Sequence, residues 1–261
     1  MSAFFVPRSR VFSLFTAALI IFSASVAASS QQPRRSPTET VREFYKAMRE
    51  KRFRDAFDLS IYKSAIDPLK PQEFEDLRPD FEKMALAIPA DVDVSGETIS
   101  GDLATVFVKV KEGDAAEKSE PVLLMLLDGA WVIGDKDNQA IVKKAGKQFF
   151  FNARIDTHHD EVQAMLTRIS LAELVYSQQH NGLFADLATL IAAGLIPKDL
   201  EGTESTGYRF HINTASAGKV WNAAAEPAQY GRTGKLSFYL DAAGVRSADK
   251  GGKPLTPATQ N

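Results

Sequence analysis

The amino-acid sequence predicts an α+β protein with two successive units, each made of helices followed by an antiparallel sheet. Apolar residues recur at spacings of three and four between residues 38 and 87, which is the period of a helix with one buried face. From residue 92 to residue 133 the period changes to two, which is typical of strands. The same change recurs between residues 157 and 245, so the helix-then-sheet order is present twice.

The first 28 residues have the pattern of a secretory signal peptide. Arg8 and Arg10 precede an apolar run from Val11 to Phe22. Small residues follow the run: Ala24, Ser25, Ala27 and Ala28. Because the run is about half of the roughly 20 residues that span a bilayer as a helix, we expect cleavage after Ala27 or Ala28. The alternative is a leader retained as a membrane anchor. The mature chain is expected in the periplasm or outside the cell, with no transmembrane anchor.

The composition excludes several classes of chemistry. The 261 residues include no cysteine, so disulfides, thiolate metal sites and cysteine nucleophiles are all excluded. The formal charge is −2, and without Arg8 and Arg10 the balance is 29 basic to 33 acidic residues. No basic patch is present, so nucleic acid is not an expected partner.

The first predicted unit spans residues 37–136 and follows a polar linker over residues 29–36. Thr38 is expected to cap a helix with an apolar stripe. The stripe has four members: Val41, Phe44, Tyr45 and Met48. A short helix is expected around residues 53–59, and a longer one over residues 72–87, ended by Pro89. Strands are then expected around residues 92–99, 103–111, 122–127 and 131–133, with a hairpin turn at Asp128-Gly129.

Two short motifs in this unit carry a family resemblance. The first is G-D-x-A-x-V from Gly101 to Val106, and the second is D-G-x-W-x-I from Asp128 to Ile133. With the order of elements, they resemble the nuclear-transport-factor-2-like cone domains of exported bacterial proteins of unknown function. The resemblance implies a cone of sheet and helices around a pocket, which some relatives use for catalysis and others for binding or assembly.

No catalytic residue is predicted in the cone. Histidine is the commonest general acid or base near neutral pH, and all four histidines lie beyond this unit: His158, His159, His180 and His211. Asp93, Glu97 and Lys109 are possible pocket groups, although alternating charges are more typical of a solvated sheet face. An open pocket lined by ionisable groups would favour an enzyme. A pocket filled by side chains would favour a binding role, and the candidate fillers are Phe74, Phe81, Met84 and Trp131.

Residues 137–155 are expected to form a helix that connects the two units. Its last part carries Phe149, Phe150 and Phe151 near three lysines: Lys143, Lys144 and Lys147. Such a combination occurs in helices that lie on membranes. The three aromatic residues are consecutive and point around the helix, so we favour a packed helix with a solvated lysine face.

The second predicted unit spans residues 156–255, before a tail over residues 256–261. Thr157 and Asp160 have the spacing of a capping box, and the helix that follows is expected to end at Asn181-Gly182. A metal site is the alternative use of four adjacent residues: His158, His159, Asp160 and Glu161. Adjacent helical side chains diverge by about 100°, so these four cannot converge on one ion. No metal site is therefore predicted.

A short helix is expected over residues 184–193, and strands are expected over residues 208–212, 220–225 and 236–240. Tyr208 and Phe238 occupy alternating strand positions and are expected to face the core.

The second unit carries a sharper resemblance. Its motifs are G-Y-x-F from Gly207, Y-G-x-T-G from Tyr230, and F-Y-x-D from Phe238 followed by G-V-R from Gly244. They resemble the globular heads of type IV pilins and type II secretion pseudopilins, and most of all pilin-head-like domains of exported bacterial proteins of unknown function. Pilin heads follow directly on an apolar stem, whereas a whole domain precedes this one, so incorporation into a filament is not expected. Pseudopilin heads can hold calcium in the region of Asp241 and Asp249, but two carboxylates do not supply the six to eight oxygens that calcium takes.

The sequence predicts no catalytic, cofactor-binding or metal-binding residue. The function it favours is a non-enzymatic binding or assembly protein of the cell envelope, whose partner is an unidentified envelope protein or a small ligand. The alternative is an enzyme or small-ligand carrier that uses the pocket of the cone.

Overall fold

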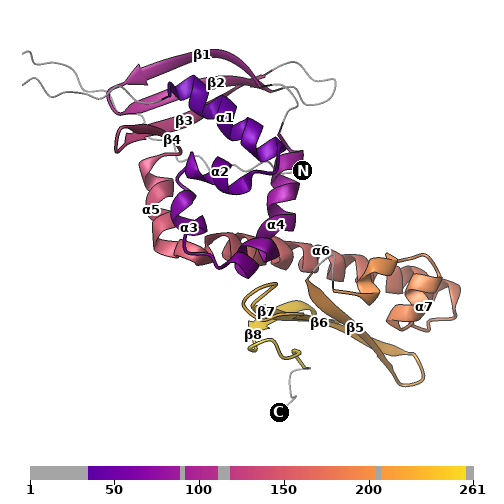
Figure 1. Ribbon diagram of the computed structural model, residues 1–261. Helices are drawn as coiled ribbons and strands as arrows, with labels where there is room; N and C mark the ends of the chain where they lie inside the picture. The colour runs from indigo at the N-terminus through magenta and orange to yellow at the C-terminus, as the bar shows by residue number, and fades with distance from the viewer. Residues whose placement is uncertain (1–34, 89–91, 111–117, 204–206, 257–261) are drawn as a thin grey trace, which may run out of the picture. The chain divides into compact units, whose positions relative to one another are not determined.

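The computed structural model describes residues 35–88, 92–110, 118–203 and 207–256. The predicted signal peptide, most of the linker and residues 257–261 lie outside this part of the chain. The predicted α+β class is confirmed, because helices accompany two four-stranded antiparallel sheets with strand orders β1-β2-β3-β4 and β5-β6-β7-β8 (Figure 1). The chain divides into two compact units, one made of Met1–Ile66 and Phe74–Lys144 and the other of Asp67–Glu73 and Ala145–Asn261. In the described ranges, none of the helices combines the length and the apolar character that crossing a membrane requires.

The helices of the first unit are α1 (Pro37–Arg49), α2 (Phe53–Asp58), α3 (Lys63–Ile66), α4 (Pro71–Leu86, of which the first three residues group with the second unit) and α5 (Lys136–Ala145). The expected cap at Thr38 is wrong by two residues. Ser36 caps α1 in a capping box with Glu39, and Pro37 occupies the first helical position, where its missing N–H costs nothing.

The first sheet consists of β1 (Asp93–Ser100), β2 (Leu103–Val110), β3 (Lys118–Leu127) and β4 (Ala130–Ile133). Asp128 and Gly129 both have positive φ, +49° and +75°, as the predicted two-residue hairpin requires. One face of the sheet packs on α1, where Val106, Val108 and Trp131 join Val41 in an apolar cluster.

A cluster of phenylalanine rings fills the space between α2 and α4. The Phe81 ring centroid lies 4.9 Å from that of Phe57, 5.6 Å from that of Phe53 and 5.5 Å from that of Phe74. All four rings are buried. Of the candidate fillers named above, Phe74, Phe81 and Trp131 are buried, and Met84 is half-buried.

The second unit contains the long helix α6 (Phe149–Gln179), the short α7 (Leu187–Ala192), and two 3₁₀ turns, η1 (Gly146–Gln148) and η2 (Lys198–Glu201). Its sheet consists of β5 (Tyr208–Ala215), β6 (Val220–Pro227), β7 (Leu236–Asp241) and β8 (Gly244–Asp249). Leu166 and Ile169 of α6 pack on the inner face of this sheet. The prediction for Tyr208 and Phe238 is confirmed, because both are fully buried in this cluster, and the Tyr208 hydroxyl donates to the Leu236 carbonyl at 2.9 Å.

The expected helix start at Thr157 is wrong. Helix α6 begins at Phe149, and the Thr157 hydroxyl donates to the Ala153 carbonyl one turn earlier. The expected single helix over residues 137–155 is instead interrupted after Ala145, where Gly146 takes a left-handed φ of +53°. Phe150 and Phe151 are buried, and their packing extends α6 toward the N-terminus beyond Thr157 and Asp160, the residues that resemble a cap.

Candidate functional site

The charged residues considered for a cone pocket serve the fold instead. Glu97 accepts hydrogen bonds from the backbone nitrogen and the hydroxyl of Thr38 at 3.0 and 2.7 Å, so it satisfies the N-terminus of α1 from a strand. Asp93 pairs with Lys109 at 2.8 Å on exposed neighbouring strands. In the register of β1 and β2, Glu97 lies opposite the buried Val106, whereas Asp93 lies opposite Lys109 on the other face. The three groups do not converge.

The adjacent histidines of α6 hold a loop of their own unit. The Nδ1 atom of His158 lies 2.8 Å from the Thr233 carbonyl. The Nε2 atom of His159 accepts from the backbone nitrogens of Lys235 and Leu236 at 3.2 and 3.3 Å, which requires a neutral ring. Burial lowers the pKa of His159, in agreement with that role. Asp160 and Glu161, the other two candidates, are exposed.

Asp241 and Asp249 lie at opposite ends of the β7–β8 hairpin. Asp241 pairs with Gly244 in the register, and Asp249 pairs with Leu236 at the far end. The carboxylate of Asp241 accepts from the Ala243 nitrogen at 2.9 Å. That of Asp249 accepts from the Tyr230 hydroxyl at 2.9 Å and the Gly251 nitrogen at 3.0 Å, which lowers its pKa. Each aspartate stabilises a separate turn, so they do not form a shared calcium site.

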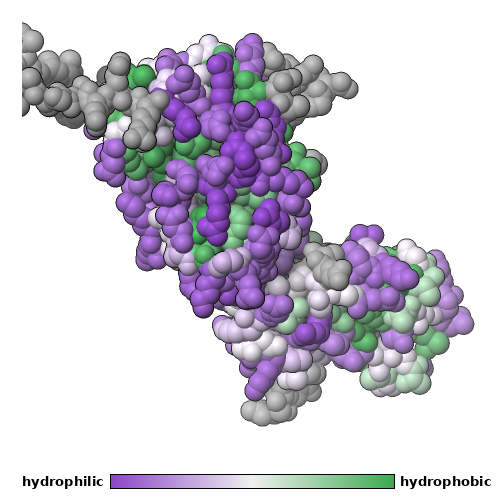
Figure 2. Space-filling view, viewed as in Figure 1, coloured by the Kyte–Doolittle hydropathy of each residue, from purple (hydrophilic) through white to green (hydrophobic). Residues whose placement is uncertain are grey.

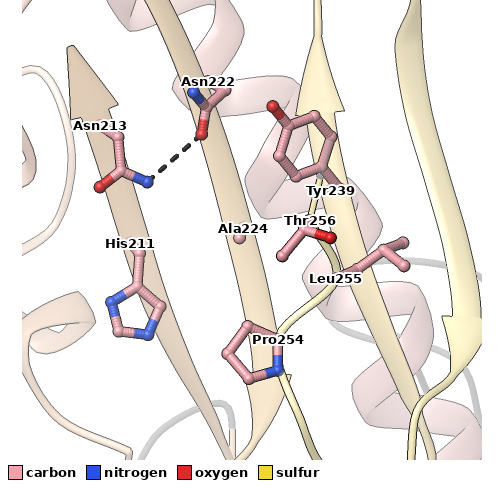
Figure 3. A pocket seen from close by; sticks show the side chains of 8 residues that line it. All are labelled: His211, Asn213, Asn222, Ala224, Tyr239, Pro254, Leu255 and Thr256. Atoms are coloured by element: carbon pink, nitrogen blue, oxygen red, sulfur yellow. Dashed lines mark hydrogen bonds between the residues drawn. The ribbon is translucent and has the colours of Figure 1, made fainter. Parts of the chain in front are cut away.

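An open pocket of about 240 Å³ lies on the outer face of the second sheet (Figure 3). Three strands and the C-terminal segment contribute its walls: His211 and Asn213 of β5, Asn222 and Ala224 of β6, Tyr239 of β7, and Pro254, Leu255 and Thr256. The register explains the convergence, because His211 pairs with Ala224 and Ala224 with Tyr239, while Asn213 pairs with Asn222 in the next outward-facing row. The small Ala224 leaves the space between the larger side chains.

A buried carboxylate orients the imidazole of this pocket. The Nε2 atom of His211 lies 2.8 Å from Oε1 of Glu226, whose side chain is nearly inaccessible to solvent. Because Nε2 is engaged by the carboxylate, Nδ1 is the ring nitrogen of His211 left for a ligand. Oε2 of Glu226 is buried without a hydrogen-bond partner among the described residues.

The C-terminal segment closes one side of the pocket. The Ser237 hydroxyl donates to the Lys253 carbonyl at 2.7 Å, and Arg246 donates to the Thr256 carbonyl at 3.0 Å. The Arg246 guanidinium also lies 4.3 Å from the centroid of the Tyr239 ring, a cation–π distance. These contacts hold residues 253–256 across the sheet.

The sequence pattern did not reveal this pocket. The available signal was the alternation of His211 and Asn213 with the buried Phe210 and Ile212, which places polar residues on the outer face of β5. The contribution of Tyr239 and of the C-terminal segment depends on strand order and chain path, which alternation does not specify.

The first unit carries a different kind of surface. Leu103 and Phe107 of β2 flank Thr105, and Thr105 pairs with Leu123 of β3, so the three apolar side chains share the sheet face opposite α1. They are 51%, 37% and 46% exposed. We call this group the Phe107 face. In Figure 2, hydrophobic patches interrupt the mostly hydrophilic surface of this unit.

No protein-family model, curated protein or solved structure matches the chain.

Proposed function

We propose that this protein is a non-enzymatic, exported binding or assembly protein of the cell envelope, and that the Phe107 face is its docking surface for a protein partner. Under this proposal the first unit is a nuclear-transport-factor-2-like cone and the second a pilin-head-like domain. The motifs at Gly101, Asp128, Gly207 and Tyr230 support these two assignments.

The exposed Phe107 face carries the proposal. An antiparallel sheet with one face on a core normally presents polar residues on the other face. Here Leu103, Phe107 and Leu123 are adjacent in the register and exposed, while the opposite face of the same strands carries the buried Val106 and Val108. Apolar groups that gather on a surface in this way mark interaction sites, because covering them removes apolar area from water.

The interior of the first unit favours binding over catalysis. Phe74, Phe81 and Trp131 are buried. Glu97 caps α1, and Asp93 and Lys109 form a surface ion pair. The signal-peptide pattern at Arg8 to Ala28 supports export.

Substituting a charge into the Phe107 face tests the proposal. Phe107→Glu is expected to release the protein from its complex, because burying the new carboxylate against apolar surface costs several kcal/mol. Leu86→Glu is the matched control, since Leu86 is exposed on α4 of the same unit. The measurement is the native mass of the exported protein in detergent-free extracts of the producing cell, by size exclusion with light scattering.

The wild type and Leu86→Glu should elute in an assembly larger than one chain, and Phe107→Glu should elute with the mass of one chain. A wild-type protein that already elutes as one chain would contradict the proposal.

A further inference from the structure

The pocket of the second sheet is surrounded by hydrogen-bonding atoms that the fold does not use. Asn213 donates through Nδ2 to Oδ1 of Asn222 at 3.3 Å, which leaves Oδ1 of Asn213 and Nδ2 of Asn222 without a partner among the described residues (Figure 3). The hydroxyl of Tyr239 and the Nδ1 atom of His211 also make no hydrogen bond to the residues described here. The pocket therefore presents both donors and acceptors around the small Ala224.

The buried Glu226 holds the imidazole that lines the pocket. Its side chain is 7% exposed, one oxygen holds His211 and the other has no partner in the described part of the chain. A buried carboxylate oxygen without a hydrogen-bond partner lowers the stability of the fold, which favours a role for Glu226 beyond packing. Glu226 itself does not line the pocket, and none of the lining residues is an aspartate, glutamate, lysine or arginine. The wall therefore offers no direct charged partner, which favours a neutral ligand.

The apolar part of the wall limits the shape of that ligand. Ala224, Pro254 and Leu255 supply carbon surface between the polar groups. A volume of about 240 Å³ is below the roughly 300–1,000 Å³ of pockets for drug-sized molecules. A ring with hydroxyl groups at its edge and C–H groups on its faces matches both features, because each hydroxyl both donates and accepts.

We propose that this pocket binds one neutral sugar ring, with the carboxamides of Asn213 and Asn222 and the imidazole of His211 bonding its hydroxyls. The ring is either a free monosaccharide or one unit of a glycan chain, which the same contacts would recognise. The site lies in the second unit, and the proposal does not depend on the Phe107 face of the first.

Ligand-observed saturation-transfer NMR on the mature full-length protein tests the site. The probes are glucose, galactose, mannose and N-acetylglucosamine at millimolar concentration, together with a trisaccharide of each sugar that binds. Acetate and ethylammonium are the charged comparisons. At least one sugar or its trisaccharide should receive saturation, and neither charged probe should. If only trisaccharides bind, the source is a glycan chain.

Two variants show whether the binding belongs to this pocket. Asn222→Ala and Tyr239→Phe each remove polar atoms from the wall and should weaken binding roughly 3- to 10-fold, the equivalent of one hydrogen bond. Gln163→Ala, which truncates an exposed carboxamide on α6, should bind like the wild type. Unchanged thermal melting shows that each variant is folded.

Three results would overturn the proposal: no sugar in the panel binds, acetate or ethylammonium binds as well as the sugars, or Asn222→Ala binds them as the wild type does. Phe107→Glu should leave sugar binding unchanged. A failure of the sugar-binding proposal can therefore be distinguished from a failure of the docking proposal.

Discussion

The environment of Glu173 differs strongly from that of an ordinary surface carboxylate. It is fully buried on α6 within the apolar cluster of the second unit. Oε2 accepts from the Ala185 backbone nitrogen at 3.0 Å, and Oε1 is buried with no partner in the described ranges. Burial raises its pKa to about 7, and the nearby Asp186 contributes in the same direction.

This raised pKa predicts that the second unit loses stability as the pH rises. Between about pH 4.5, the ordinary value for a glutamate, and pH 7, the folded state binds more protons at Glu173 than the unfolded state does. The stability that protonated Glu173 gives to the folded state is therefore fully present below that pH range and is lost as the pH rises through it. Glu173→Gln keeps an acceptor for Ala185 without a charge, so it should be more stable than the wild type at pH 8 by about 1–3 kcal/mol.

Urea unfolding of the full-length protein at pH 5 and pH 8 measures the effect. The difference between Glu173→Gln and the wild type should grow with pH, while Glu161→Gln, on the exposed side of the same helix, should track the wild type. A Glu173→Gln protein that is less stable at pH 8 would show that the charged form is the one the fold stabilises.

At the scale of elements, the sequence pattern predicted the strands and the C-terminal end of α6 at Asn181-Gly182 well, and the start of α6 poorly. Period-two alternation predicts β2, the continuous apolar run from Val122 to Leu127 predicts β3, and a turn that needs positive φ predicts the hairpin at Asp128-Gly129. The start of α6 depends on the burial of Phe150 and Phe151, which overrides the cap-like sequence at Thr157. Local cap signals compete with packing that the sequence does not reveal.

The candidate site shows the same limit. His211 and Asn213 are recognisable as outward-facing polar residues of one strand. They lie next to Tyr239 only because the strand order is β5-β6-β7. Pro254 and Leu255 close one side of the pocket because of the path that the chain takes after β8. Neither follows from alternation in a single strand.

Removing the Phe238 ring should test the core of the second sheet. Phe238→Ala is expected to cost roughly 3 to 5 kcal/mol, because the buried ring lies against Tyr208 and His159 at centroid distances of 5.9 and 5.8 Å. Thermal or urea unfolding measures the loss. Val245→Ala, at an exposed position of β8, is the control and should change stability by less than about 1 kcal/mol. An unaltered melting temperature for Phe238→Ala would contradict the packing described here.

At the scale of the whole molecule, the proposed export signal precedes two compact units that carry different surfaces. Export predicts that the mature protein begins at Ala28 or Ser29, because the small residues after Phe22 fit a cleavage site. N-terminal sequencing of protein recovered from the periplasm or medium measures this directly. An intact Met1 in a membrane pellet would favour the retained anchor instead.

Site-specific photo-crosslinking at Phe107 tests most directly whether the first sheet docks a protein partner, as we propose. A photoreactive phenylalanine analogue at position 107 samples the exposed face of β2, and the same analogue at Leu86 samples exposed surface on α4. In the producing cell, we predict a discrete crosslinked product from position 107 and none of that mass from position 86. No product from position 107, or the same products from both positions, would contradict the account.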